Sequence, residues 1–319
     1  MKFKRCVPMC QQVGNSVRAR VEMKFVGNFE EIEGLVQFAC AAIEAVRVRR
    51  AAIEVNLHSQ KERRIFSRQR EGATGVVNDD IVTLWTQYST QWDALAHVGQ
   101  NFDADGDGVP EPVYYNGFRG GSDVIGPDDT DGPAARALGI ENMAESCVQG
   151  RGVMVDLHAR FGAERKLVGY DDLLTTMDSD GVVVEEGDML CLHTGYADAI
   201  LNMGGNPDPK VLHHGFAVLN GRDDRLLKWL DDSGIAVLIA DNYAVEQVQG
   251  PLSGCAHCAA MPLHQACLFR LGIHLGELWH LTPLNSWLKM NKRFRFLLTA
   301  PPLRLTGSFG SPVTPVATV

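Results

Sequence analysis

Short apolar runs recur along the central part of the chain, and they predict buried strands. The runs RGVMVDL (151–157), GDMLCLHTG (187–195) and IAVLIAD (235–241) are each short, rich in aliphatic residues and bounded by polar or glycine-containing segments. The third run delivers Asp241 and Asn242 at its carboxyl end. Polar groups at strand ends are candidate site residues in open α/β sheets.

Amphipathic segments lie between these runs and predict helices. YDDLLTTM (170–177) indicates a short helix, and DDRLLKWLDDSG (223–234) has leucines at helical spacing with Gly234 as its stop. An earlier stripe of apolar residues within 28–46 predicts a buried amphipathic helix. Strands that alternate with helices indicate an α/β fold with a parallel or mixed sheet.

The segment LWTQYSTQWDALAH (84–97) concentrates polar side chains among apolar neighbours. One continuous helix would place them on separate faces, and one strand would spread them over about 33 Å. We therefore predict a strand over LWTQYSTQ, Asp93 as a helix N-cap, and a helix that begins with ALAH. Such a corner would gather Gln87, Gln91, Asp93 and His97 around a cation. The alternative is that Asp93 only caps the helix and the other three side chains are ordinary polar residues.

A second segment, MPLHQACLFRLGIHLGELWHL (261–281), supplies two more candidates. Pro262 suits the first turn of a helix and Gly272 its end, after which IHLGELW is extended. On one unbroken helix His264 and Glu277 would face opposite sides. With a break at Gly272 both can reach the same pocket, the alternative being a surface histidine and a solvated glutamate.

The stretch NFDADGDGVPEPVYYNG (101–117) imitates the first half of a calcium-binding loop. Asp103, Asp105 and Asp107 alternate and precede Gly108. The twelfth position of such a loop is Tyr114 instead of a bidentate glutamate. The segment therefore predicts either a polar surface turn or a weak calcium site.

Composition restricts the class of protein. The chain of 319 residues carries a net charge of −9, which argues against nucleic acid as a general partner. It contains no apolar stretch of the length of about 20 residues that a membrane helix needs. Its eight cysteines are scattered and are expected to be reduced thiols. We expect a cytoplasmic protein with no membrane or nucleic-acid partner, and the substrate class depends on the motifs considered next.

Several of these segments, in this order, resemble the cyclase-like metal-dependent hydrolases, a family that includes bacterial kynurenine formamidases, isatin hydrolases and trans-dienelactone hydrolases. The family signature HxGTHxDxxxH corresponds to QYSTQWDALAH at 87–97, in register but with glutamine at two histidine positions. A branch of the family has this glutamine pattern. Further matches are RGVMVDLHARFG, GVVVEEGDMLCLHTGYAD, PLHQACLFRLGIHLGELWHL and the closing FLLTAPPLRLTGSFGSPVTPVATV. They run from about residue 78 to the end.

The resemblance implies a swivelling β/β/α fold with a mixed sheet, as a homodimer or homotetramer. Residues 76–319 would form the cyclase-like hydrolase domain, and residues 1–75 a divergent N-terminal segment of the same domain. By position, Gln87, Gln91 and Asp93 would be the primary metal ligands, and His97 the catalytic histidine or a bridge to a second metal. His264 and Glu277 would be the distal pair, with both metal-binding and catalytic roles. Amide oxygens suit manganese at least as well as zinc.

The implied reaction is metal-dependent hydrolysis of a cyclic or aryl amide, imide or lactone, with His97 as general base. Pocket candidates for the substrate are Trp92, Tyr115, Asn116, Asp241, Asn242 and Glu246. Trp92 could stack on a planar substrate. Two alternatives remain open from the sequence: a polyketide-type cyclase or lyase, and a metal-free binding protein of the same fold.

Overall fold

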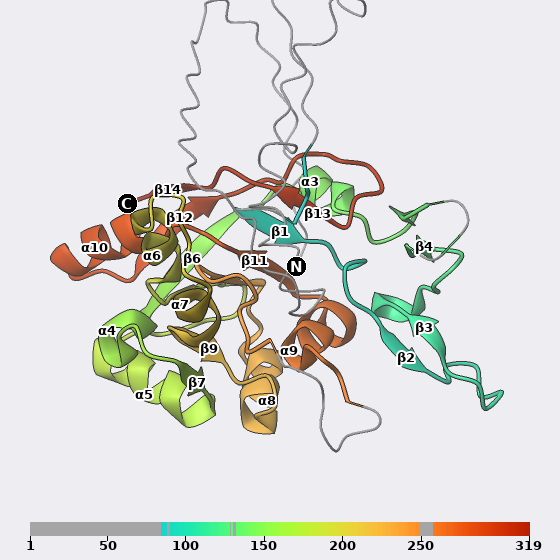
Figure 1. The fold of residues 1–319 in the computed structure, drawn as a ribbon, viewed down its shortest axis with the longest axis horizontal. Helices are drawn as coiled ribbons and strands as arrows, with labels where there is room; N and C mark the ends of the chain where they lie inside the picture. Colours follow the sequence, from blue (N-terminus) through green and yellow to red (C-terminus); the bar gives the residue numbers. More distant parts are fainter. Residues whose placement is uncertain (1–83, 88–89, 128, 130–131, 249–257) are drawn as a thin grey trace, which may run out of the picture.

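A mixed eight-stranded sheet forms the centre of the protein (Figure 1). The computed structural model describes residues 84–87, 90–127, 129, 132–248 and 258–319. The helix expected within 28–46 and the N-terminal segment 1–75 lie outside these residues. In spatial order the strands are β13 (Gly310–Pro312), β1 (Gln91–Asp93), β11 (His274–Glu277), β10 (Val237–Ala240), β8 (Met189–His193), β6 (Gln149–Asp156), β12 (Arg295–Thr299) and β14 (Val316–Thr318).

The four central strands β11, β10, β8 and β6 run parallel. β1 and β12 flank them and pair antiparallel, and the edge strands β13 and β14 pair antiparallel with β1 and β12 in turn. Their carboxyl ends therefore lie along one edge of the sheet. Three small two-stranded sheets add β2 (Gln100–Phe102) with β3 (Glu111–Val113), β4 (Val124–Ile125) with β5 (Ala134–Ala135), and β7 (Lys166–Val168) with β9 (Ala217–Leu219). The fold is the mixed α/β arrangement that the sequence predicts.

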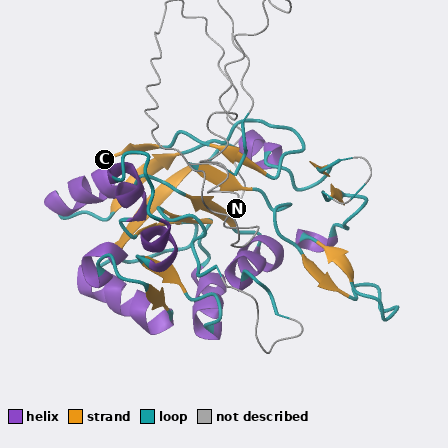
Figure 2. Cartoon of the chain, viewed as in Figure 1, coloured by secondary structure: helices purple, strands orange, loops and turns teal. Residues whose placement is uncertain are grey.

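Helices cover both faces of this sheet (Figure 2). They are α3 (Glu141–Ser146), α4 (Leu157–Phe161), α5 (Tyr170–Asp180), α6 (Tyr196–Asn202), α7 (Pro209–His214), α8 (Asp224–Ser233), α9 (Pro262–His264) and α10 (Thr282–Met290), with a 3₁₀ turn η2 (Tyr115–Gly117) and a π-helix η3 (Gln265–Leu271). The segments predicted at 170–177 and 223–234 are α5 and α8, and Gly234 ends α8 with φ 62°.

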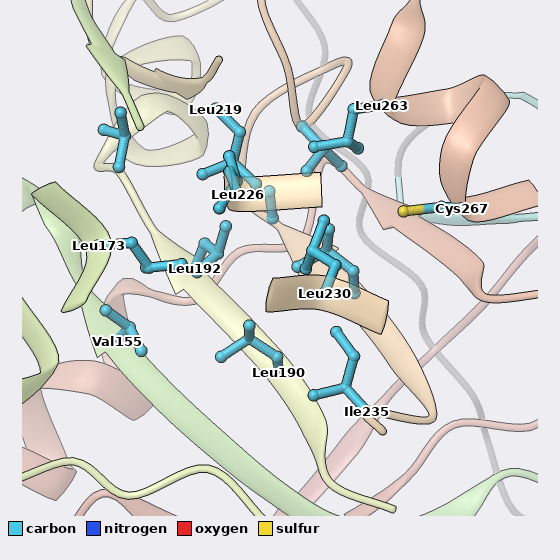
Figure 3. Packing of buried hydrophobic residues seen from close by; sticks show 14 of the residues in the cluster. Val155, Leu173, Leu190, Leu192, Leu219, Leu226, Leu230, Ile235, Leu263 and Cys267 are labelled. Atoms are coloured by element: carbon cyan, nitrogen blue, oxygen red, sulfur yellow. The ribbon is translucent and has the colours of Figure 1, made fainter. Parts of the chain in front are cut away.

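Strand periodicity divides the core into two layers. In β8, Leu190 and Leu192 face α5 and α8, where Figure 3 shows them beside Leu226 and Leu230. The alternate residue Cys191 faces the other layer, with α3 and α10. Burial on both faces is typical of parallel strands and explains why their sequences are almost continuously apolar.

The cysteines differ in part from the expectation. Cys147, Cys191 and Cys267 are free, but Cys258 is disulfide-bonded. The prediction that all eight are reduced is therefore wrong at Cys258, because spacing alone does not report how closely two sulfur atoms approach. None of the described helices is long and apolar enough to cross a membrane.

Asp156, at the end of β6, joins that strand to α4 and α10. Its carboxylate accepts hydrogen bonds from the backbone of Ala159, from His193 Nδ1 at 2.9 Å and from Asn285 Nδ2 at 2.7 Å, and it forms an ion pair with Lys289. Burial raises the pKa of Asp156, but these partners lower it more, so that the pKa lies well below its usual value.

Replacement of Asp156 by asparagine should lower the free energy of unfolding by about 2 to 4 kcal/mol at pH 7, because it removes a buried charge from its partners. A depressed pKa stabilises the fold above the pKa of about 3.9 of an unfolded aspartate, and this advantage is lost as the pH falls below it. Urea unfolding at pH 7 and pH 3 should therefore show a smaller difference at pH 3. Asp171→Asn, at an exposed Arg225 pair, is the control and should change little. Equal losses in both variants would contradict this role.

Candidate metal and catalytic site

The register of β1 brings three polar side chains together at the carboxyl edge of the sheet. Antiparallel pairing places Gln91 opposite Glu277 of β11, and Asp93 opposite Gly310 of β13. Directly paired residues share a face of the sheet, and alternate residues on a strand also share one. Gln91, Asp93 and Glu277 therefore project to the same side, and all three are buried.

A turn, and not a helix, comes after β1. The backbone N–H of Ala94 donates to Phe309 at 2.9 Å and that of Ala96 to Leu138 at 3.3 Å, so two N–H groups that would start a helix are used by other segments. The N–H of His97 closes a turn on the carbonyl of Ala94. The predictions of an N-cap at Asp93 and of a helix from Ala94 are wrong. The predicted strand over 84–91 is wrong as well, because Gln87 lies in a turn and the strand spans Gln91–Asp93. The turn, and not a helix, brings the polar side chains of the motif together.

Four buried oxygen atoms of this motif have no hydrogen-bond partner in the part of the chain that the structure describes. They are Gln87 Oε1, Gln91 Oε1 and both carboxylate oxygens of Asp93. The amide orientations are fixed, because Gln87 Nε2 donates to the carbonyl of Phe309 at 3.1 Å and Gln91 Nε2 donates to Glu277 at 2.9 Å. Buried oxygens without partners are rare and unfavourable, and a bound cation would satisfy them. The residues present therefore fit a divalent metal ion.

Gly310 allows Gln87 to reach this position. A Cβ atom at residue 310 would lie 2.6 Å from Gln87 Nε2 and 2.8 Å from the carbonyl oxygen of Trp92. Both separations are well inside van der Waals contact, so a side chain on β13 would displace Gln87. The glycine in the closing segment GSFGSP therefore has a direct role in the placement of the first glutamine of the motif.

His264 lies between two glutamates. Its Nδ1 donates to Glu246 at 2.9 Å, and Glu246 also accepts from the backbone N–H groups of Leu263 and His264. Its Nε2 lies 3.1 Å from Glu277 and 3.8 Å from Asp93. Ligand atoms of Asp93, His264 and Glu277 all lie within 4.8 Å of one another. A carboxylate that holds one ring nitrogen while the other faces the site is the arrangement that orients histidine at metal centres.

The electrostatics of this cluster are dominated by buried carboxylates. Burial, and then the charge of Glu277, raise the pKa of Asp93 to about 7, against the opposing effects of His97 and His264. Burial also raises the pKa of Glu277. Burial lowers the pKa of His264, but its bonds to Glu246 and Glu277 raise it to about 10. A cation would favour the ionised carboxylates, so these shifts agree with the partnerless oxygens.

His97 is exposed, whereas Gln91 and Asp93 are buried. Its ring centroid lies 6.5 Å from that of His264. Although solvent reaches part of the side chain, the protein atoms packed around His97 desolvate it and lower its pKa, and the attraction to Asp93 opposes this effect. The structure thus brings together the six side chains that the sequence singled out for metal binding, namely Gln87, Gln91, Asp93, His97, His264 and Glu277. Their roles as ligands stay a prediction.

Trp92 does not face this cluster. Its side chain is completely buried in the opposite layer, where Nε1 donates to Ala300 at 2.8 Å and the ring packs edge-on against Trp279. The prediction that Trp92 stacks on a substrate is wrong, because alternate residues of a strand point to opposite faces. The neighbours Gln91 and Asp93 are on the site face for the same reason.

The polar residues after β10 hold loops in place. Asp241 is fully buried and accepts from the backbone of Thr194 and Gly195 and from the Thr194 hydroxyl. Asn242 donates to Ala217 and accepts from Val245. These hydrogen bonds are made within the protein, and a contact of either residue with a substrate stays a prediction. Glu246 orients His264, a role that sequence reasoning missed.

Tyr115 and Asn116 lie in η2, away from the cluster. The Tyr115 ring packs at Gly272, where its hydroxyl would lie 2.8 Å from an added Cβ, and Asn116 is exposed with a left-handed φ of 57°. The structure shows no contact between either residue and the six side chains of the cluster among the residues it describes. Their binding role stays a prediction.

The aspartate-rich segment forms a surface turn. Asp103 accepts from the backbone N–H groups of Gly106, Asp107 and Gly108, and Asp105 accepts from Asp107. Asp103 and Asp105 also form a potential cation-binding group with Glu111, which is paired with Arg119. The aspartate side chains accept these backbone hydrogen bonds and so stabilise a local turn, which accounts for their spacing without a bound ion. Calcium binding there stays a prediction.

Three non-glycine residues beside the site have left-handed backbones. They are Phe216, Val245 and Leu278, with φ values of 63°, 54° and 56°. Val245 precedes Glu246, and Leu278 comes directly after Glu277. Such conformations are unfavourable for β-branched and bulky residues and are found preferentially at functional sites. The sequence does not predict a left-handed backbone at these three positions, because such a conformation is normally expected at glycine.

Comparison with known proteins places this geometry in context. The family model described as "putative cyclase" matches residues 36–247. A crystal structure described as a novel cyclase is 27% identical, with a TM-score of 0.62 over 77% of this chain and 72% of that chain. Isatin hydrolase A from Labrenzia aggregata, bound to benzyl benzoate, is 13% identical, with a TM-score of 0.48 over 76% of this chain and 77% of that chain.

A structure described as a potential metal-dependent hydrolase with cyclase activity is 15% identical, with a TM-score of 0.44 over 76% of this chain and 84% of that chain. No curated protein matches the chain. The family match begins at residue 36, so it includes part of the N-terminal segment in which no motif was found. Because this match spans more than half of the sequence, the chain belongs to the cyclase family.

Proposed function

We propose that this protein is a metal-dependent hydrolase of a cyclic or aryl amide, imide or lactone. The observation that carries the proposal is the set of four buried, partnerless oxygen atoms on Gln87, Gln91 and Asp93. They lie beside a compact group of Asp93, His264 and Glu277 in a chain of the cyclase family. Among the residues that the structure describes, these oxygen atoms form no hydrogen bond that would account for their burial.

The residues that would hold the metal are Gln87, Gln91 and Asp93, with Glu277 and His264 next to them. Five ligand groups rich in oxygen suit manganese or magnesium at least as well as zinc. A divalent cation in this position supplies polarisation of a substrate carbonyl and acidification of a water molecule. We propose manganese or zinc as the resident ion, with the two amides in place of imidazoles favouring manganese.

His97 is the proposed general base. It is exposed while Asp93 and His264 are buried, so it is the imidazole that solvent and substrate can reach. It would accept the proton of the attacking water and return it to the leaving nitrogen or oxygen. Glu277 would hold its negative charge in the same buried group. Glu246 would keep His264 in one orientation through two hydrogen bonds, one to the ring and one to the backbone N–H.

A cyclase or lyase reaction is the second candidate, favoured by the description of the family and by the acid and base that His97 and Glu277 could provide. A third possibility is a metal-free binding protein. The three differ in the source of the oxygen in the product and in their need for metal, and both can be measured.

The first prediction concerns metal and stability. After removal of metal with EDTA, addition of Mn²⁺ or Zn²⁺ should raise the melting temperature by about 5 °C at about a hundredfold excess over Kd, because the ion binds only the folded state. Asp93→Ala should abolish the shift. Asp103→Ala, in the exposed turn, should retain it. If the unaltered protein shows no shift with either ion, the metal-free hypothesis replaces the proposal.

Asp93 and His97 should have separable effects on catalysis. Asp93→Ala should lose bound metal and activity together, because it removes the carboxylate of the 87–97 motif. His97→Ala should retain KM but lower kcat by about 10²- to 10⁴-fold, the range of general acid–base catalysis. His280→Ala, an exposed histidine beside Asp198, is the control and should keep full activity. Full turnover by His97→Ala would remove His97 from the mechanism.

Water labelled with ¹⁸O distinguishes hydrolysis from the cyclase or lyase reaction. A hydrolase should place one labelled oxygen in the carboxyl product of each turnover, because water attacks the carbonyl carbon. Mass spectrometry of the product after a single turnover measures this incorporation. A product without label would assign the site to the cyclase or lyase class.

A further inference from the structure

A cavity of about 270 Å³ lies beside the turn that comes after β1. The apolar part of its lining includes Leu95 and Phe118, and the polar part includes Glu141 and Asn142 of α3 and His274 of β11. None of the six side chains of the metal cluster belongs to its described lining. Its volume is near the lower end for small-molecule sites, so the cavity fits a compact ligand.

His274 points away from the metal cluster. It lies three residues before Glu277 on the same strand, so the two side chains project to opposite faces of the sheet. The face of His274 is the one on which a Cβ atom at Gly276 would meet Trp92. The cavity that His274 lines is therefore a site of its own.

The His274 ring offers this cavity a hydrogen-bond acceptor. Its Nδ1 donates to the backbone carbonyl of Asp93 at 2.7 Å, which places the proton of the neutral ring on Nδ1 and leaves the lone pair on Nε2. Among the residues that the structure describes, Nε2 has no hydrogen-bond partner, and it is not one of the buried partnerless atoms. Nε2 is therefore open to an N–H group of a ligand.

Glu141 and Asn142 supply two more acceptors. Glu141 Oε2 accepts from the backbone N–H of Gly307 at 3.1 Å, and the hydrogen bonds of the described residues leave Oε1 without a donor. Asn142 Nδ2 donates to the carbonyl of Gly139 at 2.9 Å, which orients the amide and leaves Oδ1 as an acceptor in the same way. With His274 Nε2, the lining thus offers a carboxylate oxygen, an amide oxygen and an imidazole nitrogen.

This set of acceptors matches a primary ammonium group. Such a group has three N–H donors and one positive charge, and its hydrogen bond to a carboxylate is stronger than one between neutral groups. Arg136 also lines the cavity, but it is exposed and donates to the carbonyl of Ser122 at 3.5 Å. Solvent screens its charge, whereas Glu141 and His274 are half-buried.

We propose that this cavity binds a small primary ammonium ion with an apolar or aromatic group, and that it is an effector site for the metal cluster. The ammonium group would donate to Glu141, Asn142 and His274. The apolar group would pack against Leu95 and Phe118. The binding of the amine is independent of the proposed function, whereas its effect on the metal rests on it.

Two hydrogen bonds connect the lining of the cavity to the turn at 93–97. His274 donates to the carbonyl of Asp93, and the backbone N–H of Ala96 donates to the carbonyl of Leu138, which also lines the cavity, at 3.3 Å. A ligand in the cavity would restrain the turn from which Asp93 and His97 project. Because a first ligand that orders a segment lowers the ordering cost for a second, amine and metal should favour each other.

NMR titration of the EDTA-treated full chain with benzylammonium and with neutral benzyl alcohol tests the amine site without metal. At about pH 8 an ordinary imidazole is neutral, and benzylammonium should bind more tightly than the alcohol. Glu141→Gln, which keeps an oxygen for the N–H of Gly307, should weaken benzylammonium by about tenfold or more and leave the alcohol unchanged. Glu145→Gln, which removes an exposed carboxylate of the same helix, is the control and should change neither. Equal affinity for the two compounds, or tighter binding of benzoate, overturns the site.

Titration of Mn²⁺ with and without saturating benzylammonium tests the effector role. The amine should raise the affinity for Mn²⁺ by about fivefold, and Mn²⁺ should raise the affinity for the amine by the same factor. Glu141→Gln should bind Mn²⁺ normally but show no effect of the amine, which also controls for complexes formed in solution.

The outcomes separate this inference from the proposed function. If Mn²⁺ binds but benzylammonium does not, the inference is wrong and the hydrolase proposal stands. If benzylammonium binds through Glu141 but the protein binds neither Mn²⁺ nor Zn²⁺, the amine site stands, and its effector role and the hydrolase proposal both fail. Binding of both without mutual effect overturns the effector role alone.

Discussion

The register between β1 and β11 is the constraint on which the site depends. Gln91 lies opposite Glu277 because these two short strands pair antiparallel at the edge of a parallel core. A shift of one residue would turn Gln91 and Asp93 into the apolar layer and bring Trp92 to the site face. The fully buried Trp92 and Trp279 oppose this shift, because each indole N–H also has a backbone acceptor. The packing of one face therefore fixes the chemistry of the other.

The remaining groups converge on this pair from distant parts of the chain. Gly310 leaves the space for Gln87, and Glu246 holds His264 where the chain enters α9 and the π-helix η3. The cluster thus combines an edge strand, the loop after β10 and a helix start, each anchored to the sheet. Because these anchors do not depend on a bound ion, the carboxylates stay close together at the expense of their ionisation, as the raised pKa of Asp93 indicates.

The sequence predicts the central elements well because their patterns are strong. The strands β6, β8 and β10 and the helices α5 and α8 are predicted by apolar runs, helical spacing and the stop at Gly234. The turn after Asp93 is not predicted, because the N–H groups of Ala94 and Ala96 are taken by residues far along the chain. Nor does periodicity identify the face of a three-residue strand, as Trp92 illustrates.

The left-handed residues Phe216, Val245 and Leu278 connect the site to the stability of the whole protein. Glycine at any of them would relieve the backbone, but it would also remove an apolar side chain that packs at the site or in the core. A glycine at these positions would therefore relieve backbone strain at the cost of packing. Selection for thermal tolerance in this protein would have to act elsewhere, on loops and surfaces remote from the carboxyl edge of the sheet.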